Sequence, residues 1–508
     1  MDYVIGCDVG SQGVKAVLLS LEGNPCAQAS MSYSVSYPRP AWAEQSPEVW
    51  LSSLAKAIRS LLAASGTAGS HVRAIGVDAQ LDGVIPVDRE GQALRPAIVW
   101  MDRRAVPQCH AMAGLIDPKT LFHRTGLNID PSHVAPKIRW IMENEVRVSD
   151  QCVYWLLPTC LVTGHLTGEV AIDASNASCT MLFDVQARGW SEALCDLFAI
   201  DPRKLPPIRS AYEVLGGLHL AAAEELGLPA GIPVVVGCGD EQAATLGAGV
   251  TQPGQICDVA GTAEPVCAVG RECLFDEAHL VETHCHAVPD HWFLENPGFL
   301  SGANLSWFRD QFVARWASPS GDQGVSYFQL DQAAASIPSG AEGLLMLPCL
   351  MGAMTPTWNA SARGTFFGFT LAHRREHFIR AVLEASAYAL RDITDRMRAI
   401  GLPTEELRVV GGGARSRLWC QIKSDVTGIP ACVPEMTDSA SIGSAMLALV
   451  AIGAFDSFPQ AAGNLVRVRE AFDPDPAAHA RYEECYQLYR STYFALEPVF
   501  GQAARNEN

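Results

Sequence analysis

The sequence predicts an α/β protein that is built from two related halves. A length of 508 residues exceeds what one hydrophobic core usually supports. Short apolar segments end in glycine turns, which is typical of strands. A strand-turn unit near the start is repeated about 250 residues later, which indicates a duplication.

The first unit is a β-meander whose first two strands are residues 3–8 and 15–20. Glycines in the connecting turn, residues 10–13, let the backbone approach a ligand closely. Successive amides and the Ser11 hydroxyl can donate hydrogen bonds to phosphate oxygens. Asp8 could hold a magnesium ion through water. A tight hairpin with a polar tip is the alternative.

The second unit, residues 255–263, matches residues 4–12 once one residue is inserted. In this match the Gly-Thr pair at 261–262 corresponds to the Gly-Ser pair at 10–11. Each unit would bring one phosphate loop to a shared cleft. Chance similarity in so short a window is the competing explanation.

Residues 234–249, near the middle of the chain, place a carboxylate at a strand-to-helix junction. Three valines run into Gly237 and Gly239, and Asp240 then opens a helix of small residues. Such a junction faces a crevice in α/β proteins, where Asp240 can accept a proton from a substrate hydroxyl. The alternative is that Asp240 only caps the helix.

Polar side chains also follow two strands of the first half, residues 72–77 and the strand that starts at Ile98. Hydroxylated substrates usually bind at such strand ends. The candidates are Asp82, Trp100, Asp102 and Arg104. Asp78 and Arg103 could instead form a solvated ion pair.

The second half contains a long helical pattern over residues 376–400 and a strand over residues 407–410. That strand opens on a glycine turn, residues 411–416, at the start of another helix. A glycine turn at a helix N-terminus suits phosphates or adenosine. The boundary between the halves is expected in or just after the proline-punctuated residues 191–233.

Histidine and cysteine residues suggest neither a metal site nor disulfides. The cluster after the second unit comprises His284, Cys285, His286 and His291. It completes no usual zinc spacing, so core and strand packing is favoured. The 16 cysteines are scattered without a C-x-x-C pair, which suits reduced, packed thiols.

Charge and hydropathy narrow the function further. A formal net charge of -18 repels polyanions, so a nucleic-acid partner is excluded. No segment approaches the ~18 consecutive apolar residues of a membrane helix, and the start lacks the basic and apolar regions of a signal peptide. We therefore expect a cytoplasmic protein without a membrane partner.

Several motifs together form a pattern that is more specific than any one of them. They are residues 8–15, 42–45, 135–137 with Trp140, 166–169, 237–242, 364–368 with 381–384, and 411–416. By this pattern the chain, from about residue 4 to about residue 490, resembles the FGGY carbohydrate kinase family and within it the xylulokinases. The resemblance implies an α/β fold of two ribonuclease-H-like lobes, of the actin/hexokinase/Hsp70 type, around an ATP cleft.

The resemblance also implies a division of the chain. Residues 1–235 are expected to form the N-terminal lobe, with the sugar-binding side and the first phosphate loop. Residues 236–475 are expected to form the C-terminal lobe, with the nucleotide-binding side. Residues 476–508 are expected to form a C-terminal helix that could pack back on the N-terminal lobe.

ATP and Mg²⁺ are the implied cosubstrate and metal. Asp240 is the implied catalytic base, and Asp8 and Asp240 are the expected carboxylates near magnesium. Together with the strand-end candidates, the expected sugar contacts are Gln80, Leu81, Asp82, Trp100, Asp102, Arg104, Asp240 and Glu241. The expected ATP contacts are Gly10, Ser11, Gln12, Gly13, Lys15, Gly261, Thr262, Gly302, Gly411, Gly412, Gly413, Ala414 and Arg415.

The sequence departs from the family's pattern on the sugar side. Typical xylulokinases carry Gln-Met-His-Gly and Asp-Asn where this chain has Asp82 in the 80–83 turn and Glu241 after Asp240. A histidine donor and an amide thus become acceptors. A buried polar group left unpaired costs about 1 to 3 kcal/mol, so the swap changes which hydroxyl pattern fits.

The expected activity is transfer of phosphate from ATP to a terminal hydroxyl of a ketopentose, first of all D-xylulose. Ribulose, a heptulose, a tetritol or glycerol are alternative substrates for the same chemistry. A nucleotide-dependent sugar sensor without phosphoryl transfer is the alternative from another class. A homodimer is the base-rate expectation for assembly.

Overall fold

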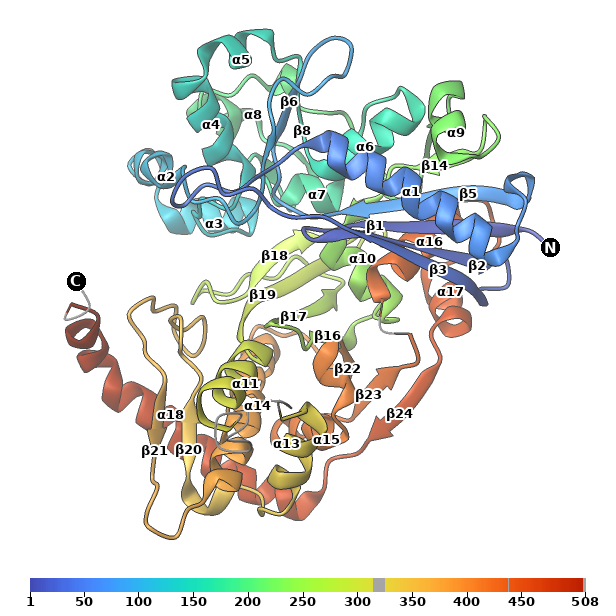
Figure 1. The fold of residues 1–508 in the computed structure, drawn as a ribbon. Helices are drawn as coiled ribbons and strands as arrows, with labels where there is room; N and C mark the ends of the chain where they lie inside the picture. The colour runs from blue at the N-terminus through green and yellow to red at the C-terminus, as the bar shows by residue number, and fades with distance from the viewer. Residues whose placement is uncertain (314–324, 437, 506–508) are drawn as a thin grey trace.

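Two lobes, each built around a mixed seven-stranded sheet, make up the protein (Figure 1). The structure is a computed structural model that describes residues 1–313, 325–436 and 438–505. The predicted α/β class with two lobes is confirmed.

The first sheet has the strand order β13-β14-β5-β1-β2-β3, and β15 also pairs with β5. Its strands are β1 (Tyr3–Val9), β2 (Gly13–Ser20), β3 (Pro25–Ser32), β5 (Val72–Ala79), β13 (Val214–Gly217), β14 (Pro233–Val235) and β15 (Cys238–Gly239). β1 runs antiparallel to β2 and parallel to β5. The predicted meander is therefore present.

The second sheet has the order β18-β19-β17-β16-β22-β23-β24. Its strands are β16 (Gly254–Val259), β17 (Ala263–Gly270), β18 (Glu282–Cys285), β19 (Trp292–Leu300), β22 (Thr404–Val410), β23 (Ala431–Pro434) and β24 (Val468–Phe472). β16 runs antiparallel to β17 and parallel to β22, so it repeats the pairing of β1. This repetition agrees with the sequence match between the two strand-turn units.

Helices of the first lobe cover one face of its sheet and build a cap beyond it (Figure 1). They are α1 (Pro47–Ser65), α2 (Val106–Ala113), α3 (Pro118–Thr125), α4 (Val134–Asn144), α5 (Val146–Gln151), α6 (Pro158–Thr167), α7 (Ala174–Ser178), α8 (Glu192–Leu197) and α9 (Leu220–Leu226). α1 packs on β2 and β3 and contributes the fully buried Trp50 to the core.

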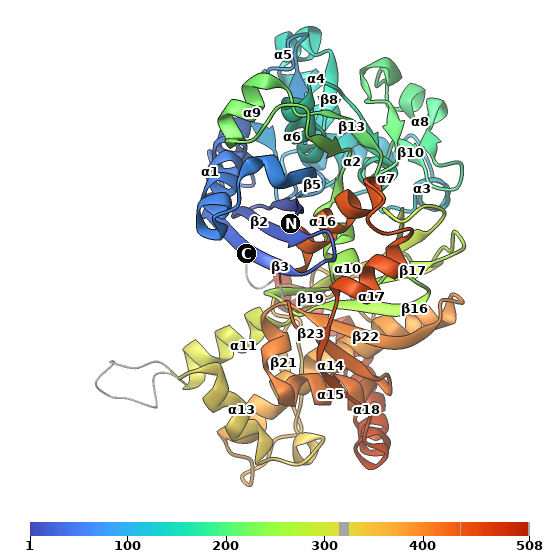
Figure 2. The same cartoon turned by 90° about the vertical axis from the view of Figure 1, so that its right-hand side faces the viewer.

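The opposite face of the first sheet is covered by α10 (Asp240–Gly247), α16 (Ser439–Ala451) and α17 (Phe458–Leu465). All three helices lie within residues 236–475, which were expected to form the C-terminal lobe. Glycines let α16 lie directly on the strands. A Cβ on Gly6 of β1 would lie 2.0 Å from the Ser441 carbonyl oxygen, and one on Gly76 of β5 would lie 1.9 Å from that of Ser444. Figure 2 shows α16 beside β2 and β5.

The second lobe contains α11 (Gly302–Phe308), α13 (Tyr327–Ala335), α14 (Arg375–Ala399), α15 (Arg417–Thr427) and α18 (Pro476–Arg505). α14 confirms the predicted long helix. The C-terminal helix α18 packs on α15 and on the short strand β20 (Leu345–Leu347), whereas one expectation put it on the first lobe. Its buried tyrosines, which include Tyr482 and Tyr489, face Tyr388 of α14 and account for this placement.

Within the described ranges, none of the helices combines the length and the apolar character that crossing a membrane requires.

Replacing Gly76 with alanine should destabilise the first lobe. The new methyl group would overlap the backbone of α16, and overpacking of this kind costs about 2 to 3 kcal/mol. Urea unfolding followed by tryptophan fluorescence should show a lower midpoint. Gly463→Ala is the control, because Gly463 lies in α17 with open space around it and alanine favours helix. Equal midpoints for the two variants would contradict the close approach of α16.

Candidate functional site

Three carboxylates meet where the central strands of the first sheet end. Asp8 of β1 lies opposite Asp78 of the parallel strand β5 and opposite Lys15 of the antiparallel strand β2. Cys238 of β15 pairs with Asp78, so the chain reaches Asp240 just beyond the same edge. The backbone register therefore brings Asp8, Asp78 and Asp240 together from distant parts of the sequence.

Burial controls the proton affinity of these carboxylates. It raises the pKa of Asp8 to about 6, against the opposing effect of Lys15. Burial, and then the charge of Asp8, raise the pKa of Asp78 well above its ordinary value. For Asp240, burial and the neighbouring Glu241 and Asp8 raise the pKa strongly. Ionising all three carboxyl groups is therefore unfavourable unless a cation binds beside them.

Asp78 does not form the solvated ion pair that was the alternative for it. Its side chain is fully buried and accepts a hydrogen bond of 2.5 Å from Ser444 Oγ of α16. Arg103 instead pairs with Asp130. The ion-pair prediction failed because Asp78 faces α16, a helix that lies far away in the sequence and that the residues around position 78 do not reveal.

The carboxylates suit a hard divalent cation. Asp78 Oδ1 is buried and has no hydrogen-bond partner among the described residues. Across the residues that the structure describes, no group of three or more His, Cys, Asp or Glu side chains is arranged so that it could hold a metal ion by itself. Magnesium commonly uses one or two carboxylates and completes its shell with water and phosphate oxygens. The donor set therefore fits Mg²⁺ held jointly with a phosphate.

Asp240 joins this edge to the predicted sugar turn. Its Oδ1 accepts hydrogen bonds from the backbone amides of Leu81, at 3.3 Å, and Glu241, at 3.1 Å. The N-cap of α10 is Gly239, and no side chain caps this helix. The alternative that Asp240 is the capping residue is therefore wrong, because Asp240 is already the first helical residue.

The first phosphate loop and the sugar turn share Ser11. The Ser11 hydroxyl donates to Gln80 Oε1 at 3.2 Å and accepts from Trp100 Nε1 at 2.9 Å. Gln45 Nε2 donates to the Ser11 carbonyl at 2.7 Å. The structure thus brings together three predicted residues, and it adds Gln45, whose only signal in the sequence was the motif at residues 42–45.

The rest of the first loop is a tight turn with accessible backbone. Gly10 N donates to Gly13 O at 3.0 Å, and Gln12 at the tip is exposed. Lys15 pairs with Asp438, just before α16, at 2.9 Å. Sequence reasoning missed Asp438, which lies 423 residues from Lys15.

Asp82 is held by two cations that the site prediction omitted. His133 Nδ1 lies 3.4 Å from Asp82 Oδ2, and Lys137 Nζ donates to the Asp82 carbonyl at 2.5 Å. Burial opposes the charge on His133, but Asp82 outweighs it and raises the pKa of His133 to about 9. Burial lowers the pKa of Lys137 to about 8. Only the motif at residues 135–137 hinted at this contribution from α4.

Glu241 meets a second glutamate from the other lobe. Its side chain interacts with Glu295 of β19, whose pKa is strongly raised by burial and by Glu241. His284 Nε2 lies 3.8 Å from Glu295, and burial lowers the pKa of His284 to about 4. His284 and Cys285 lie in the buried strand β18, so their predicted strand packing is confirmed.

Asp102 and Arg104, which follow Trp100 in the sequence, form a buried pair, whereas Trp100 is 42% exposed. Arg104 Nη2 lies 2.7 Å from Asp102 Oδ2, and the guanidinium stacks over Trp42 at 3.7 Å. Asp102 Oδ2 also accepts from the amide of Ala43 at 2.6 Å. This pair supports the wall of the site, and its direct contact with a sugar stays a prediction.

The predicted ATP segments of the second lobe also lie together. Gly302 N donates to Gly261 O at 3.0 Å, which joins the start of α11 to the loop that contains Thr262. Gly413 N donates to Ala260 O at 2.8 Å, which joins the turn at 411–415 to the same loop. Ala414 is buried and Arg415 is exposed at the end of this turn.

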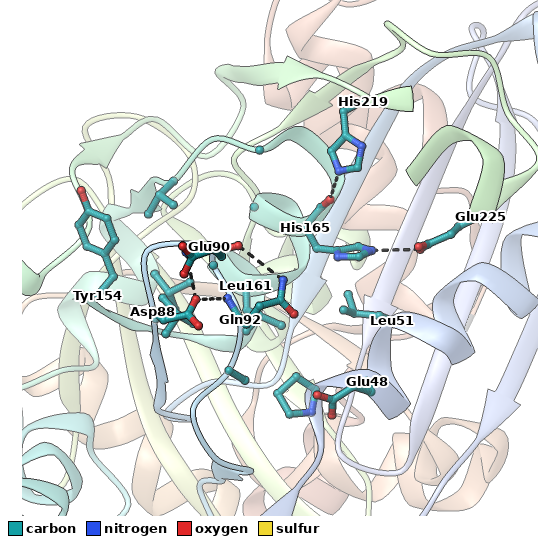
Figure 3. Close-up of a pocket in the computed structure, with 18 of the residues that line it drawn as sticks. Glu48, Leu51, Asp88, Glu90, Gln92, Tyr154, Leu161, His165, His219 and Glu225 are labelled. Carbon is teal, nitrogen blue, oxygen red and sulfur yellow. Dashed lines mark hydrogen bonds and ion pairs between the residues drawn. The ribbon is translucent and has the colours of Figure 1, made fainter. Parts of the chain in front are cut away.

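A separate cavity of about 860 Å³ lies in the first lobe between α1, α6, α9 and the turn at residues 88–92 (Figure 3). Its polar groups are largely engaged with one another. Asp88 accepts from the amide of Gln92, and His165 lies 3.0 Å from Glu225. The lining includes none of the predicted site residues. This cavity is therefore distinct from the carboxylate edge.

Comparison with known proteins gives consistent matches over nearly the whole chain. The N-terminal domain of the FGGY family of carbohydrate kinases matches residues 3–247, and its C-terminal domain matches residues 258–452. The chain is 31% identical to a xylulose kinase from Escherichia coli (strain K12), with 97% of this chain and 99% of that one covered. It is also 31% identical to a glycerol kinase from Chromobacterium violaceum, with 94% of each covered.

A solved structure agrees with the sequence comparisons. The crystal structure of xylulose kinase from Rhodospirillum rubrum superposes with a TM-score of 0.90 at 30% identity, covering 98% of this chain and all of that one. The chain belongs to the FGGY family of carbohydrate kinases, as the sequence predicted, and it is an ATP-dependent sugar kinase.

Proposed function

We propose that this kinase phosphorylates a terminal hydroxyl of a ketopentose, D-xylulose in the first place, with Asp240 as the general base. The observation that carries the proposal is the meeting of Asp240 with Asp8 and with the sugar turn at Leu81. A base must lie within hydrogen-bond reach of the hydroxyl that it deprotonates, beside the place where the phosphate arrives.

The other roles follow from the positions of the residues. Backbone amides around Gly10 and Gly261 would bind phosphate oxygens from both lobes, and the turn at 411–415 would bind adenosine. Asp8 and Asp240 would hold Mg²⁺, which when bound neutralises phosphate charge. Burial raises the pKa of Asp240 above its ordinary value, which makes its carboxylate a stronger base toward the attacking hydroxyl.

The sugar face offers mainly acceptors. Asp82 and Glu241 would present carboxyl oxygens to the sugar, while His133 contacts Asp82 and Glu295 contacts Glu241. Such a face suits the donating hydroxyls of a neutral ketose or polyol. The similarity to xylulose kinases supports D-xylulose, and the similarity to a glycerol kinase favours a polyol as the second candidate. A homodimer and a cytoplasmic location stay predictions.

Magnesium-dependent ADP production across ketoses, aldoses and polyols tests this proposal. We expect turnover that requires a sugar and is fastest with D-xylulose. Preference for a polyol would keep the chemistry and replace the substrate. ADP release that ignores every sugar, or no release with any, would contradict the proposed reaction and favour a sensor.

Asp240→Asn should lower kcat by about 10² to 10⁴, because general-base catalysis contributes that much. Calorimetric titration without magnesium should find the dissociation constant for ATP changed by less than about twofold, since the substitution removes the base and a proposed metal contact but leaves the nucleotide segments intact. Glu225→Gln, beside the separate cavity, is the control and should keep full activity. Near-normal kcat in Asp240→Asn would refute the assigned role.

Asp82→Asn should release His133. The folded-state pKa of His133, about 9, exceeds the ordinary value of 6.5. The stabilisation from this pair is therefore fully present below pH 6.5 and is lost as the pH rises through about 9. The stability difference between wild type and Asp82→Asn should shrink over that range, and histidine NMR should show a lower pKa for His133. Asp88→Asn, at a distant turn, should leave that titration unchanged.

A further inference from the structure

A buried lysine bridges both strands of the second phosphate hairpin. Asp258 lies on β16 before the loop at Gly261, and Glu264 lies on β17 after it. Lys423 of α15 places Nζ 2.6 Å from Asp258 Oδ2 and 2.9 Å from Glu264 Oε1. All three side chains are at most 1% exposed. One ammonium group therefore ties together the two ends of the loop.

The same hairpin is held from α11. Ser301 Oγ donates to the second oxygen of Glu264. The next two amides bind the loop itself, with Gly302 N 3.0 Å from Gly261 O and Ala303 N 3.1 Å from Thr262 O. The carboxyl of Glu264 thus connects the start of α11 to Lys423 through both of its oxygens.

α15 also supports the turn assigned to adenosine. Ser416 caps this helix, with Oγ accepting from Trp419 N at 3.0 Å. Trp419 lies against Gly413 of the turn, since a Cβ there would be 3.5 Å from the indole. Lys423 follows one helical turn later, 5.3 Å from the Trp419 ring. A single helix therefore contacts the adenosine turn and the phosphate loop.

Lys423 opposes the cost of burying two carboxyl groups together. Burial and the charge of Asp258 raise the pKa of Glu264, whereas the Lys423 ammonium lowers it. Removing one partner of such a buried group of charges leaves the others uncompensated, which is strongly destabilising.

We propose that Lys423 is a positioning residue for the second phosphate loop. By binding Asp258 and Glu264 it fixes Gly261 and Thr262 relative to the adenosine turn at 411–415, so that both parts of ATP meet a preformed site. The inference rests on the proposed role of this loop in binding ATP. It predicts that loss of Lys423 weakens contacts with the distal phosphates and spares those with adenosine.

Lys423→Met tests the proposal, with ATP and AMP as probes in calorimetric titrations. We expect the dissociation constant for ATP, and its KM, to rise about tenfold, which corresponds to about 1.4 kcal/mol. The dissociation constant for AMP and the KM for the sugar should change less than about twofold. Glu264→Gln keeps the pair of Lys423 with Asp258 and should weaken ATP binding less, which provides a second variant if Lys423→Met does not fold.

Arg380→Met is the matched control, because it removes a buried cation that joins Glu384 and Tyr482 elsewhere in the second lobe. It should lower stability without separating ATP from AMP. Equal losses for ATP and AMP in Lys423→Met, or the same ATP defect in the control, would overturn the positioning role alone. If the wild type bound neither nucleotide, the proposed function would fall together with this inference.

Discussion

The cost of burying negative charge governs the edge of the first sheet at which three carboxylates converge. Asp8, Asp78 and Asp240 converge because β1, β5 and β15 share one register, and burial raises the pKa of each carboxyl. Lys15 is turned toward Asp438 and compensates only part of this charge. A divalent cation at this edge would supply the missing positive charge, so the carboxylates favour the metal-bound state electrostatically.

Close packing keeps this edge in place. α16 can reach β1 and β5 because Gly6 and Gly76 leave no side chains between the backbones. The same helix brings Ser444 to Asp78 and follows Asp438, the partner of Lys15. Helix α16, from the C-terminal part of the chain, thus completes the first lobe. The chain therefore returns to the first lobe after it has formed most of the second.

Local sequence made the strands, the glycine turns and the strand-to-helix junction at Asp240 predictable, because each is defined by neighbouring residues. Partners that arrive from other elements were not predictable in this way. His133 reaches Asp82 from the N-cap of α4, and Glu295 reaches Glu241 from the other sheet. The tyrosines of α18 pack against α14. Asp102 and Arg104 were predicted as sugar contacts, and the structure shows in addition that they form a buried pair with each other. Tertiary contacts decide these cases, and a single sequence does not display them.

The two strand-turn units share a backbone pairing pattern but differ in the charges around their aspartates. In the first lobe Asp8 faces the carboxylate of Asp78 on the parallel neighbour, which leaves excess negative charge for a metal and a reacting hydroxyl. In the second lobe the corresponding Asp258 faces Val409, and Lys423 neutralises it from the helix below. The first unit therefore carries excess negative charge, whereas a lysine offsets the charge in the second. Under the proposed function the first unit would bind a metal and the second would position the nucleotide, and phosphoryl transfer requires both charge neutralisation and positioning.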